Sequence, residues 1–286
     1  MHNKLPDGQY RFGYGTYGMP DLAPAEALPR LKEMGYEGIE LNVGANYPTA
    51  PEKLSGRNRK ELRSLFADLD LHLTGLMLMS QPLVEDPGEY ERQLENLRAC
   101  AQLAAELAAG ETAPTLVTTV GGNPDQWDDG REFLVQRMKE YGQVAAEFGT
   151  QIAVEPHWGS ILNSPDQTVW LMERIDSPAV GVNFDISHFE VAGFPLVEST
   201  ASQAPYTIHT HVKDGRLEDG KCRYLLAGEG DTDYVTYFET LAAAGWFGYI
   251  TVEITAMIFR QKDYDPWSAA EFSLKTLQKA LSEARL

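Results

Sequence analysis

Four side chains that can bind a metal ion stand at or near the ends of short apolar runs in the second half of the sequence. Three are carboxylates and one is an imidazole. They are Glu155, Asp185, His211 and Glu253. Oxygen ligands with one nitrogen suit a divalent ion of the Mn²⁺, Co²⁺ or Mg²⁺ type better than structural zinc. We therefore expect one divalent metal ion, with Mn²⁺ as first choice and Co²⁺, Mg²⁺ and Zn²⁺ as alternatives.

Such a metal site points to proton abstraction beside a carbonyl group. A divalent ion that chelates a hydroxyl and the adjacent carbonyl acidifies the C–H bond between them. One carboxylate can take that proton and a second, on the opposite face, can return it. The outcome is epimerisation, isomerisation or loss of a β-substituent. We expect Glu155 and Glu253 to be the acid–base pair, with His157, two residues after Glu155, as a further catalytic candidate.

Other polar residues near the same apolar runs are candidates for binding a substrate. A lone charge in such a position is more often a solvated loop residue, and His209 is expected to pack in the core. The predicted substrate-binding residues are His188, Arg216, Glu40, Lys213 and Trp158, and the candidates for the pocket walls are Trp158, Trp127, Tyr14 and Met79.

The elements that must position these residues alternate between short β-branched runs and amphipathic segments of helical period. The predicted strands are Tyr10–Thr16, Tyr36–Val43, Leu71–Met79, Thr115–Val120, Gln151–Glu155, Val180–Asp185, Tyr206–Lys213 and Tyr249–Ile254. The predicted helices are Asp21–Gly35, Arg57–Asp70, Pro87–Ala109, Asp129–Phe148, Pro165–Ile175, Pro195–Ala204, Tyr234–Ala244 and Pro266–Arg285. A polar loop rich in Gly and Asp is expected after Lys213.

This alternation predicts an α/β fold with a parallel sheet closed into a (β/α)₈ TIM barrel. We expect a single domain over residues 1–286, because no linker or change of composition divides the chain. A doubly wound open sheet is the rival, but Gly13, Gly15 and Gly18 do not have the spacing of its phosphate-binding turn. In a barrel the carboxyl ends of the strands share one mouth, so the four metal-ligand candidates are expected to converge there.

The composition limits the classes of partner that the protein is expected to bind. A net charge of −18 over 286 residues repels phosphate backbones, so we expect no nucleic-acid partner. No stretch approaches the ~18 consecutive apolar residues of a membrane-spanning helix, and the first ten residues have no apolar core of the signal-peptide type. The two cysteines, Cys100 and Cys222, form no zinc or disulfide pattern. Together these features predict a cytoplasmic protein without a membrane partner.

Several segments together resemble the xylose-isomerase-like barrel superfamily of sugar phosphate isomerases and epimerases. They are GYGTYG at 13–18, GYEGIEL at 35–41, VEP at 154–156, NFDISH at 183–188, HTHVKDGR at 209–216, GEGDTDY at 228–234 and GYITVEI at 248–254. The resemblance covers nearly the whole chain. It implies a carbohydrate substrate, a homo-oligomer and a divalent metal, often manganese, held by residues that correspond to the four named above. In the ketose 3-epimerase branch, groups matching His188 and Arg216 contact the substrate, and the two glutamates exchange protons on opposite faces of the sugar carbon.

One segment departs from the ketose-epimerase pattern. These epimerases carry a further carboxylate shortly after the first metal glutamate, whereas this sequence has His157, Trp158, Gly159, Ser160 and Ile161 there. The segment resembles members that act on keto-sugars or keto-glycosides by elimination, in which a histidine can serve as base; keto-inositol dehydratases are related. The DNA-repair endonuclease branch binds three zinc ions and needs more than the six histidines of this chain.

The leading hypothesis is therefore a metal-dependent isomerase or epimerase that acts on a ketose or related keto-polyol. The alternative is a metal-dependent lyase that acts on a 3-keto-glycoside or dehydrates a keto-inositol. A third hypothesis is a non-catalytic sugar-binding barrel. The complete set of metal-ligand candidates argues against it.

Overall fold

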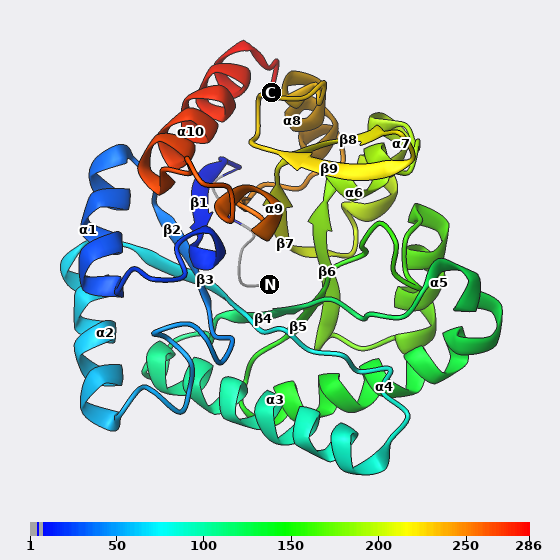
Figure 1. The fold of residues 1–286 in the computed structure, drawn as a ribbon, viewed down its shortest axis with the longest axis horizontal. Helices are drawn as coiled ribbons and strands as arrows, with labels where there is room; N and C mark the ends of the chain where they lie inside the picture. Colours follow the sequence, from blue (N-terminus) through cyan, green and yellow to red (C-terminus); the bar gives the residue numbers. More distant parts are fainter. Residues whose placement is uncertain (1–4, 6–7) are drawn as a thin grey trace.

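Eight parallel strands close into a barrel at the centre of the molecule (Figure 1). The structure is a computed structural model that describes residue 5 and residues 8–286. The strands follow one another around the barrel in chain order, and the last pairs with the first. They are β1 (Arg11–Gly15), β2 (Gly38–Asn42), β3 (His72–Met77), β4 (Thr115–Thr118), β5 (Ile152–Val154), β6 (Val180–Asp185), β7 (Thr207–Val212) and β10 (Tyr249–Val252). The predicted (β/α)₈ barrel is confirmed.

Helices surround the barrel (Figure 1). The main ones are α1 (Pro24–Met34), α2 (Gly56–Asp68), α3 (Pro87–Ala108), α4 (Trp127–Glu147), α5 (Pro165–Ile175), α7 (Leu196–Gln203), α8 (Tyr234–Ala243) and α10 (Pro266–Glu283). Shorter turns are the 3₁₀-helices η1 (Thr16–Gly18) and η2 (Pro124–Gln126), together with α6 (Ile186–Val191) and α9 (Ala256–Phe259). Within the described part of the chain, no helix has the length and apolar character needed to cross a membrane.

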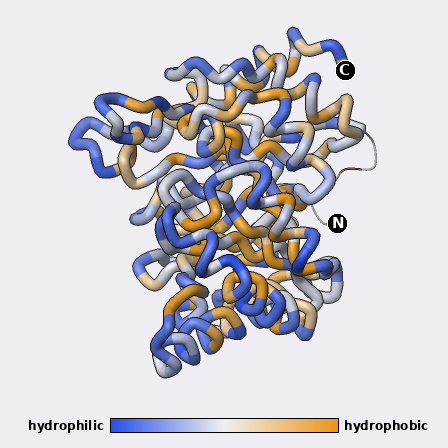
Figure 2. Tube along the Cα trace, turned by 90° about the vertical axis from the view of Figure 1, so that its right-hand side faces the viewer, coloured by the Kyte–Doolittle hydropathy of each residue, from blue (hydrophilic) through white to orange (hydrophobic). Residues whose placement is uncertain are grey.

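The outer helices bury one stripe of side chains against the barrel. In α3 the buried residues include Tyr90, Leu94, Leu97 and Ala101, which recur every three or four positions as an amphipathic helix requires. Hydrophobic and hydrophilic stretches accordingly alternate along these helices (Figure 2). The packing of apolar stripes against the barrel holds the strand ends, and with them the polar residues of the mouth, in fixed positions.

One prediction about this part of the chain is wrong. The segment expected to be a loop after Lys213 is an antiparallel hairpin of β8 (Asp214–Glu218) and β9 (Lys221–Leu225). Asp219 and Gly220 form its two-residue turn with positive φ angles of 51° and 73°. An Asp-Gly pair favours this type of hairpin turn, because both central residues must adopt the left-handed region. The hairpin also places Cys222 on a strand.

Candidate metal centre

The four predicted metal ligands lie together at the carboxyl ends of neighbouring barrel strands. Glu155 and Glu253 directly follow β5 and β10, Asp185 ends β6, and His211 lies in β7. One ligand atom from each residue lies within 4.8 Å of those from the other three. All four residues are buried, with at most 4% of their surface exposed. The strand register explains the convergence, because His211 is the direct partner of Asp185 on β6 and of Thr251 on β10.

This donor set fits a divalent metal ion. Three carboxylates gathered out of water repel one another unless cations lie among them. His211 supplies one positive group, with its Nδ1 2.9 Å from Glu155 Oε1 and 3.8 Å from Glu253 Oε2. Carboxylate oxygens and one imidazole nitrogen at this spacing are ligands that Mn²⁺, Zn²⁺ and Mg²⁺ accept to different degrees. The residues present are therefore able to hold such an ion.

Lys213, a predicted substrate-binding residue, is part of this cluster and lines the cavity above it. Its ammonium group is ion-paired with both Asp185 Oδ2 and Glu253 Oε2, and only 1% of the residue is exposed. Burial lowers the pKa of Lys213, but the two carboxylates outweigh burial and hold the pKa above its ordinary value. The centre thus contains a fixed positive charge of its own.

The two glutamates have pKa values moved in opposite directions. Burial raises the pKa of both carboxyl groups. For Glu155, the opposing effect of the His211 charge and hydrogen bond, together with Lys213, brings the pKa below its ordinary value. For Glu253, burial exceeds the effect of Lys213 and His211, so the pKa lies above its ordinary value. Two carboxyl groups with pKa values moved in opposite directions are typical of acid–base sites.

A cavity of about 220 Å³ opens above this cluster. Its polar wall contains Glu155, His157, His188, Lys213 and Glu253. Its other wall is largely apolar, and Met79 is the predicted wall residue that it contains. The remaining residues of the lining were not predicted from the sequence; they are Tyr17, Met77, Thr119, Thr255, Ala256 and Met257, with Tyr224 beside the histidines. The cavity therefore presents both acid–base groups and apolar surface to a bound molecule.

His157 faces this cavity from the loop after β5. Its Nδ1 lies 2.6 Å from the carbonyl oxygen of Trp158, which can only accept, so Nδ1 carries a proton and Nε2 is left with a lone pair. Burial lowers the pKa of His157, although Glu155 acts in the opposite direction. The rings of His157 and His188 lie 4.1 Å apart between centroids. His157 is thus held as a neutral imidazole next to the metal ligands.

His188 is held by a residue that the sequence did not single out. The hydroxyl of Tyr224 lies 2.6 Å from His188 Nδ1. Burial raises the pKa of Tyr224, so the hydroxyl stays protonated and donates a hydrogen bond to this nitrogen. His188 Nε2 then faces the metal cluster, 3.9 Å from Glu155 Oε1 and 3.8 Å from Asp185 Oδ2. Tyr224 was overlooked because its segment was predicted to be a loop, whereas β9 carries it to the cavity.

Glu40 does not reach the cavity, so its predicted contact with a substrate has to be corrected. The residue is 0% exposed, and its carboxylate points across the barrel interior to His209 and His211. His209, which was expected to pack in the core, is fully buried and pairs with Glu40 Oε2 at 3.0 Å. These three residues form a second buried group beneath the first.

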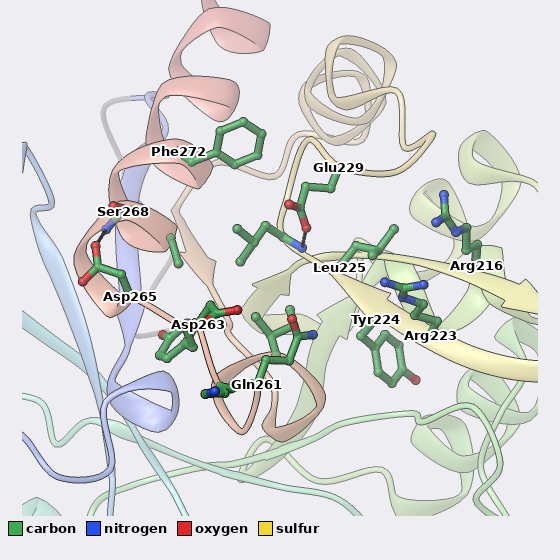
Figure 3. Close-up of a pocket in the computed structure, with 15 residues that line it drawn as sticks. Arg216, Arg223, Tyr224, Leu225, Glu229, Gln261, Asp263, Asp265, Ser268 and Phe272 are labelled. Carbon is green, nitrogen blue, oxygen red and sulfur yellow. Dashed lines mark hydrogen bonds between the residues drawn. The ribbon is translucent and has the colours of Figure 1, made fainter.

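Two further candidates lie away from the metal cluster. The Arg216 side chain is exposed on β8 and paired with Glu218 at 2.6 Å. It lines a separate pocket of about 730 Å³ between the hairpin and α10, where Figure 3 shows it beside Arg223. Trp158 contributes main-chain groups, its N–H lying 3.4 Å from His188 Nδ1, and its ring is not part of the cavity wall. Neither Arg216 nor the Trp158 ring is therefore placed to touch a molecule bound at the metal cluster.

Two of the predicted wall residues also lie elsewhere. Tyr14 packs edge-on against Tyr36 in the core, and Trp127 packs against Trp170 on the outer helices.

Sequence comparison places most of the chain in a known family. Residues 28–280 match the family model described as xylose isomerase-like TIM barrel. An inosose dehydratase from Geobacillus thermodenitrificans is 28% identical over 290 residues, which cover 88% of this chain and 90% of that protein.

Solved structures share the fold. A structure of the IOLI protein with a bound zinc atom has a TM-score of 0.81 at 16% identity and covers 96% of this chain and 99% of its own. The apo form of 3-keto-D-glucoside 4-epimerase from E. coli has a TM-score of 0.74 at 18% identity, with 95% of this chain and 100% of that chain covered. At these identities the likeness extends to the fold alone.

Proposed function

The chain belongs to the xylose isomerase-like TIM barrel family, and from this membership we propose that it is a divalent-metal-dependent dehydratase of a keto-polyol of the inosose type. The proposal selects the lyase among the two activities that the sequence left open. The observation that carries it is His157, a neutral imidazole that faces the cavity beside Glu155 and His188. The relationship to an inosose dehydratase supports the same choice.

The proposed metal ligands are Glu155, Asp185, His211 and Glu253, whose ligand atoms lie within 4.8 Å of one another. A divalent ion held by them would supply Lewis-acid stabilisation of the negative charge that develops on the carbonyl oxygen. Mn²⁺ stays our prediction, and the IOLI structure supports Zn²⁺ as an alternative.

His157 is the proposed base. Its Nε2 takes the proton from the carbon next to the carbonyl group, and the electron pair of that C–H bond stays on the substrate, delocalised onto the carbonyl group. The C–O bond of the β-hydroxyl then breaks, the carbon–carbon double bond forms, and the hydroxyl leaves as water with the proton that His157 returns. The reaction needs no other reactant and no net proton. His188, fixed by Tyr224, is proposed to bind a substrate oxygen above the metal cluster.

The dimensions of the cavity agree with this substrate class. A cavity of about 220 Å³ suits a molecule of the size of one sugar ring. Its polar wall matches the hydroxyl groups of a polyol, and the methionine and tyrosine side chains opposite match the C–H face of the ring.

An epimerase is the second candidate, because Glu155 and Glu253 line the same cavity and have pKa values moved in opposite directions. In that reaction one glutamate would take the proton and the other would return it from the opposite face.

The homo-oligomer, the single domain over residues 1–286 and the cytoplasmic location also stay predictions.

Product analysis with a panel of substrates tests the choice. The protein would be loaded with Mn²⁺ or Zn²⁺ and incubated with keto-inositols, 3-keto-glycosides and ketoses. A dehydratase produces an unsaturated or diketo product with loss of water from the keto-inositol, detected by absorbance and mass. Conversion of any of these compounds to an epimer of unchanged mass, without an unsaturated product, would contradict the proposal and favour the second candidate.

A further inference from the structure

The carboxylate of Glu40 occupies a space that two glycines keep open. Glu40 lies on β2, and its direct partners on the neighbouring strands are Gly15 of β1 and Gly75 of β3. A Cβ atom at Gly15 would lie 3.1 Å from Glu40 Oε1, and one at Gly75 would lie 3.3 Å from Oε2. Such contacts are too close for most side chains, so the barrel interior is shaped around this carboxylate.

The Glu40 side chain reaches a predicted metal ligand from behind. His211 Nε2 lies 3.0 Å from both carboxylate oxygens of Glu40, while His211 Nδ1 faces Glu155 at 2.9 Å. His209 Nε2 lies 3.0 Å from Glu40 Oε2. Glu40, His209 and His211 are all 0% exposed, so no solvent competes for these contacts.

A carboxylate accepts hydrogen bonds and donates none, which fixes the proton positions around it. The His211 nitrogen that faces Glu40 must carry a hydrogen, so Nε2–H donates to Glu40. When a metal ion binds the imidazole, Nδ1 must offer its lone pair. In the metal-free centre Nδ1 also faces a carboxylate, that of Glu155, so both nitrogens carry hydrogens and the ring is positive. A bound metal ion would take the place of the hydrogen on Nδ1, whereas Glu40 keeps the hydrogen on Nε2.

Asn183 supports the same orientation from the other side. Its amide nitrogen lies 2.9 Å from His211 Nδ1 and 3.1 Å from Glu155 Oε1. If the amide were turned round, its oxygen would face a carboxylate oxygen, which is repulsive. The amide nitrogen therefore faces both Glu155 and Nδ1, and it can donate to Nδ1 only in the state in which Nε2 alone carries the proton.

We propose that Glu40 is a positioning residue that acts through His211, holding Nε2 protonated and Nδ1 directed at the other metal ligands. The inference rests on the proposed metal centre and goes beyond its ligand set. Glu40 touches no substrate, and its effect is on metal binding. Loss of a hydrogen-bond partner behind a metal-bound histidine typically weakens metal affinity by about 10–100-fold.

Glu40→Gln is the informative variant because glutamine has nearly the same shape. Its amide can accept from His211 through oxygen or donate to it through nitrogen, so both imidazole tautomers become possible. Asp214→Asn is the matched control. Asp214 is also a fully buried acid, but it accepts from the Gly228 and Gly230 N–H groups and the Tyr234 hydroxyl, and His211 is not among these partners.

The affinity for Zn²⁺ and Mn²⁺ would be measured by calorimetric titration of the full-length, metal-free protein. We expect Glu40→Gln to bind each ion about 10–100-fold more weakly than the wild type, and Asp214→Asn to bind within about threefold of it. Equal affinity of the wild type and Glu40→Gln would overturn the role of Glu40. If the wild type itself binds no divalent ion, the metal centre of the proposed function fails instead, so the two failures are distinguishable.

A second measurement does not depend on whether a variant folds. Long-range ¹H–¹⁵N correlation spectra of Zn²⁺-loaded, ¹⁵N-histidine-labelled wild type report which nitrogen of each of the six histidines carries the proton. We expect His211 to have a proton on Nε2 and a metal-shifted Nδ1. A protonated Nδ1 with Nε2 bound to the metal would overturn the proposal.

Discussion

Replacement of Lys213 by methionine tests the electrostatic design of the centre. The change keeps most of the length of the side chain and removes its ammonium group. In the wild type this group is ion-paired with Asp185 and Glu253, and both of these residues are at most 4% exposed. In the metal-free variant the two carboxylates would face each other without this cation.

The size of the effect follows from the burial of the pair. Removing one partner of a buried ion pair costs about 3–5 kcal/mol. For chains of this size, about 1 kcal/mol lowers the melting temperature by roughly 2 °C. We therefore expect metal-free Lys213→Met to melt roughly 6–10 °C below the wild type. A divalent ion should reduce this difference, because its charge compensates the same carboxylates.

The assay is thermal unfolding at pH 8, with a chelator and then with saturating Mn²⁺ or Zn²⁺. Lys262→Met is the control, since Lys262 is exposed and a surface change of this kind is usually worth less than about 0.5 kcal/mol. Equal melting temperatures of metal-free wild type and Lys213→Met would refute the reasoning, as would a deficit that saturating metal does not reduce.

Three further predictions concern the acid–base groups and stability. Glu155→Gln and Glu253→Gln should each lower kcat at least ~100-fold while circular dichroism stays unchanged, because each removes a proposed metal ligand and, in the epimerase alternative, a proton-transfer group as well; wild-type turnover in either variant would contradict this. His157→Ala should lower the dehydration rate by about 100–10,000-fold, and if the enzyme is instead an epimerase using two glutamates, turnover should largely survive. Burial raises the pKa of Glu190, and the nearby carboxylates of Asp214 and Asp185 act in the same direction. The hydrogen bond that Glu190 accepts from the Thr232 hydroxyl lowers the pKa but does not offset them. The folded state thus binds this proton more tightly than the unfolded state, so stability falls as pH rises from the ordinary carboxyl value through the raised one. Glu190→Gln should therefore melt above the wild type at pH 8, and this advantage should shrink as the pH falls toward 4.5; an advantage that grows on acidification would contradict the assignment.

The sequence predicts the barrel and the four metal ligands for a simple physical reason. β-branched runs that alternate with amphipathic helices leave few arrangements other than a parallel sheet, and parallel strands bring their carboxyl ends to one edge. Residues at those ends, such as Asp185 on β6 and His211 on β7, are then neighbours through strand register alone. No side chain has to be placed in detail.

Residues away from the strand ends were harder to place. Lys213 is predicted to bind a substrate, and its ion pairs with Asp185 and Glu253 do not follow from that prediction, although it follows His211 by two positions and therefore points to the same side of the chain. Glu40 was placed at the mouth because the strand direction is visible in the sequence, but the depth of its side chain depends on the glycines of two other strands.

The hairpin shows what local patterns leave undecided. Its Asp219-Gly220 turn is a recognisable signal, and reading it would have revealed two strands in the expected loop. The same hairpin separates Arg216 from the cavity and brings Tyr224 to it. Which face of the hairpin turns toward the barrel depends on its packing against the rest of the protein, and sequence spacing does not report this.

Proton exchange at the substrate carbon tests the central claim most directly. The metal-loaded protein would be incubated in D₂O with a keto-inositol, and deuterium at the carbon next to the carbonyl group would be measured by mass spectrometry and NMR in recovered substrate and in product. Abstraction by a group of this centre predicts loss of the original hydrogen at that carbon, at a rate that falls to the uncatalysed level when a chelator removes the metal and returns when Mn²⁺ or Zn²⁺ is restored. Turnover that leaves this hydrogen in place, or that continues unchanged in the chelated protein, would contradict the account.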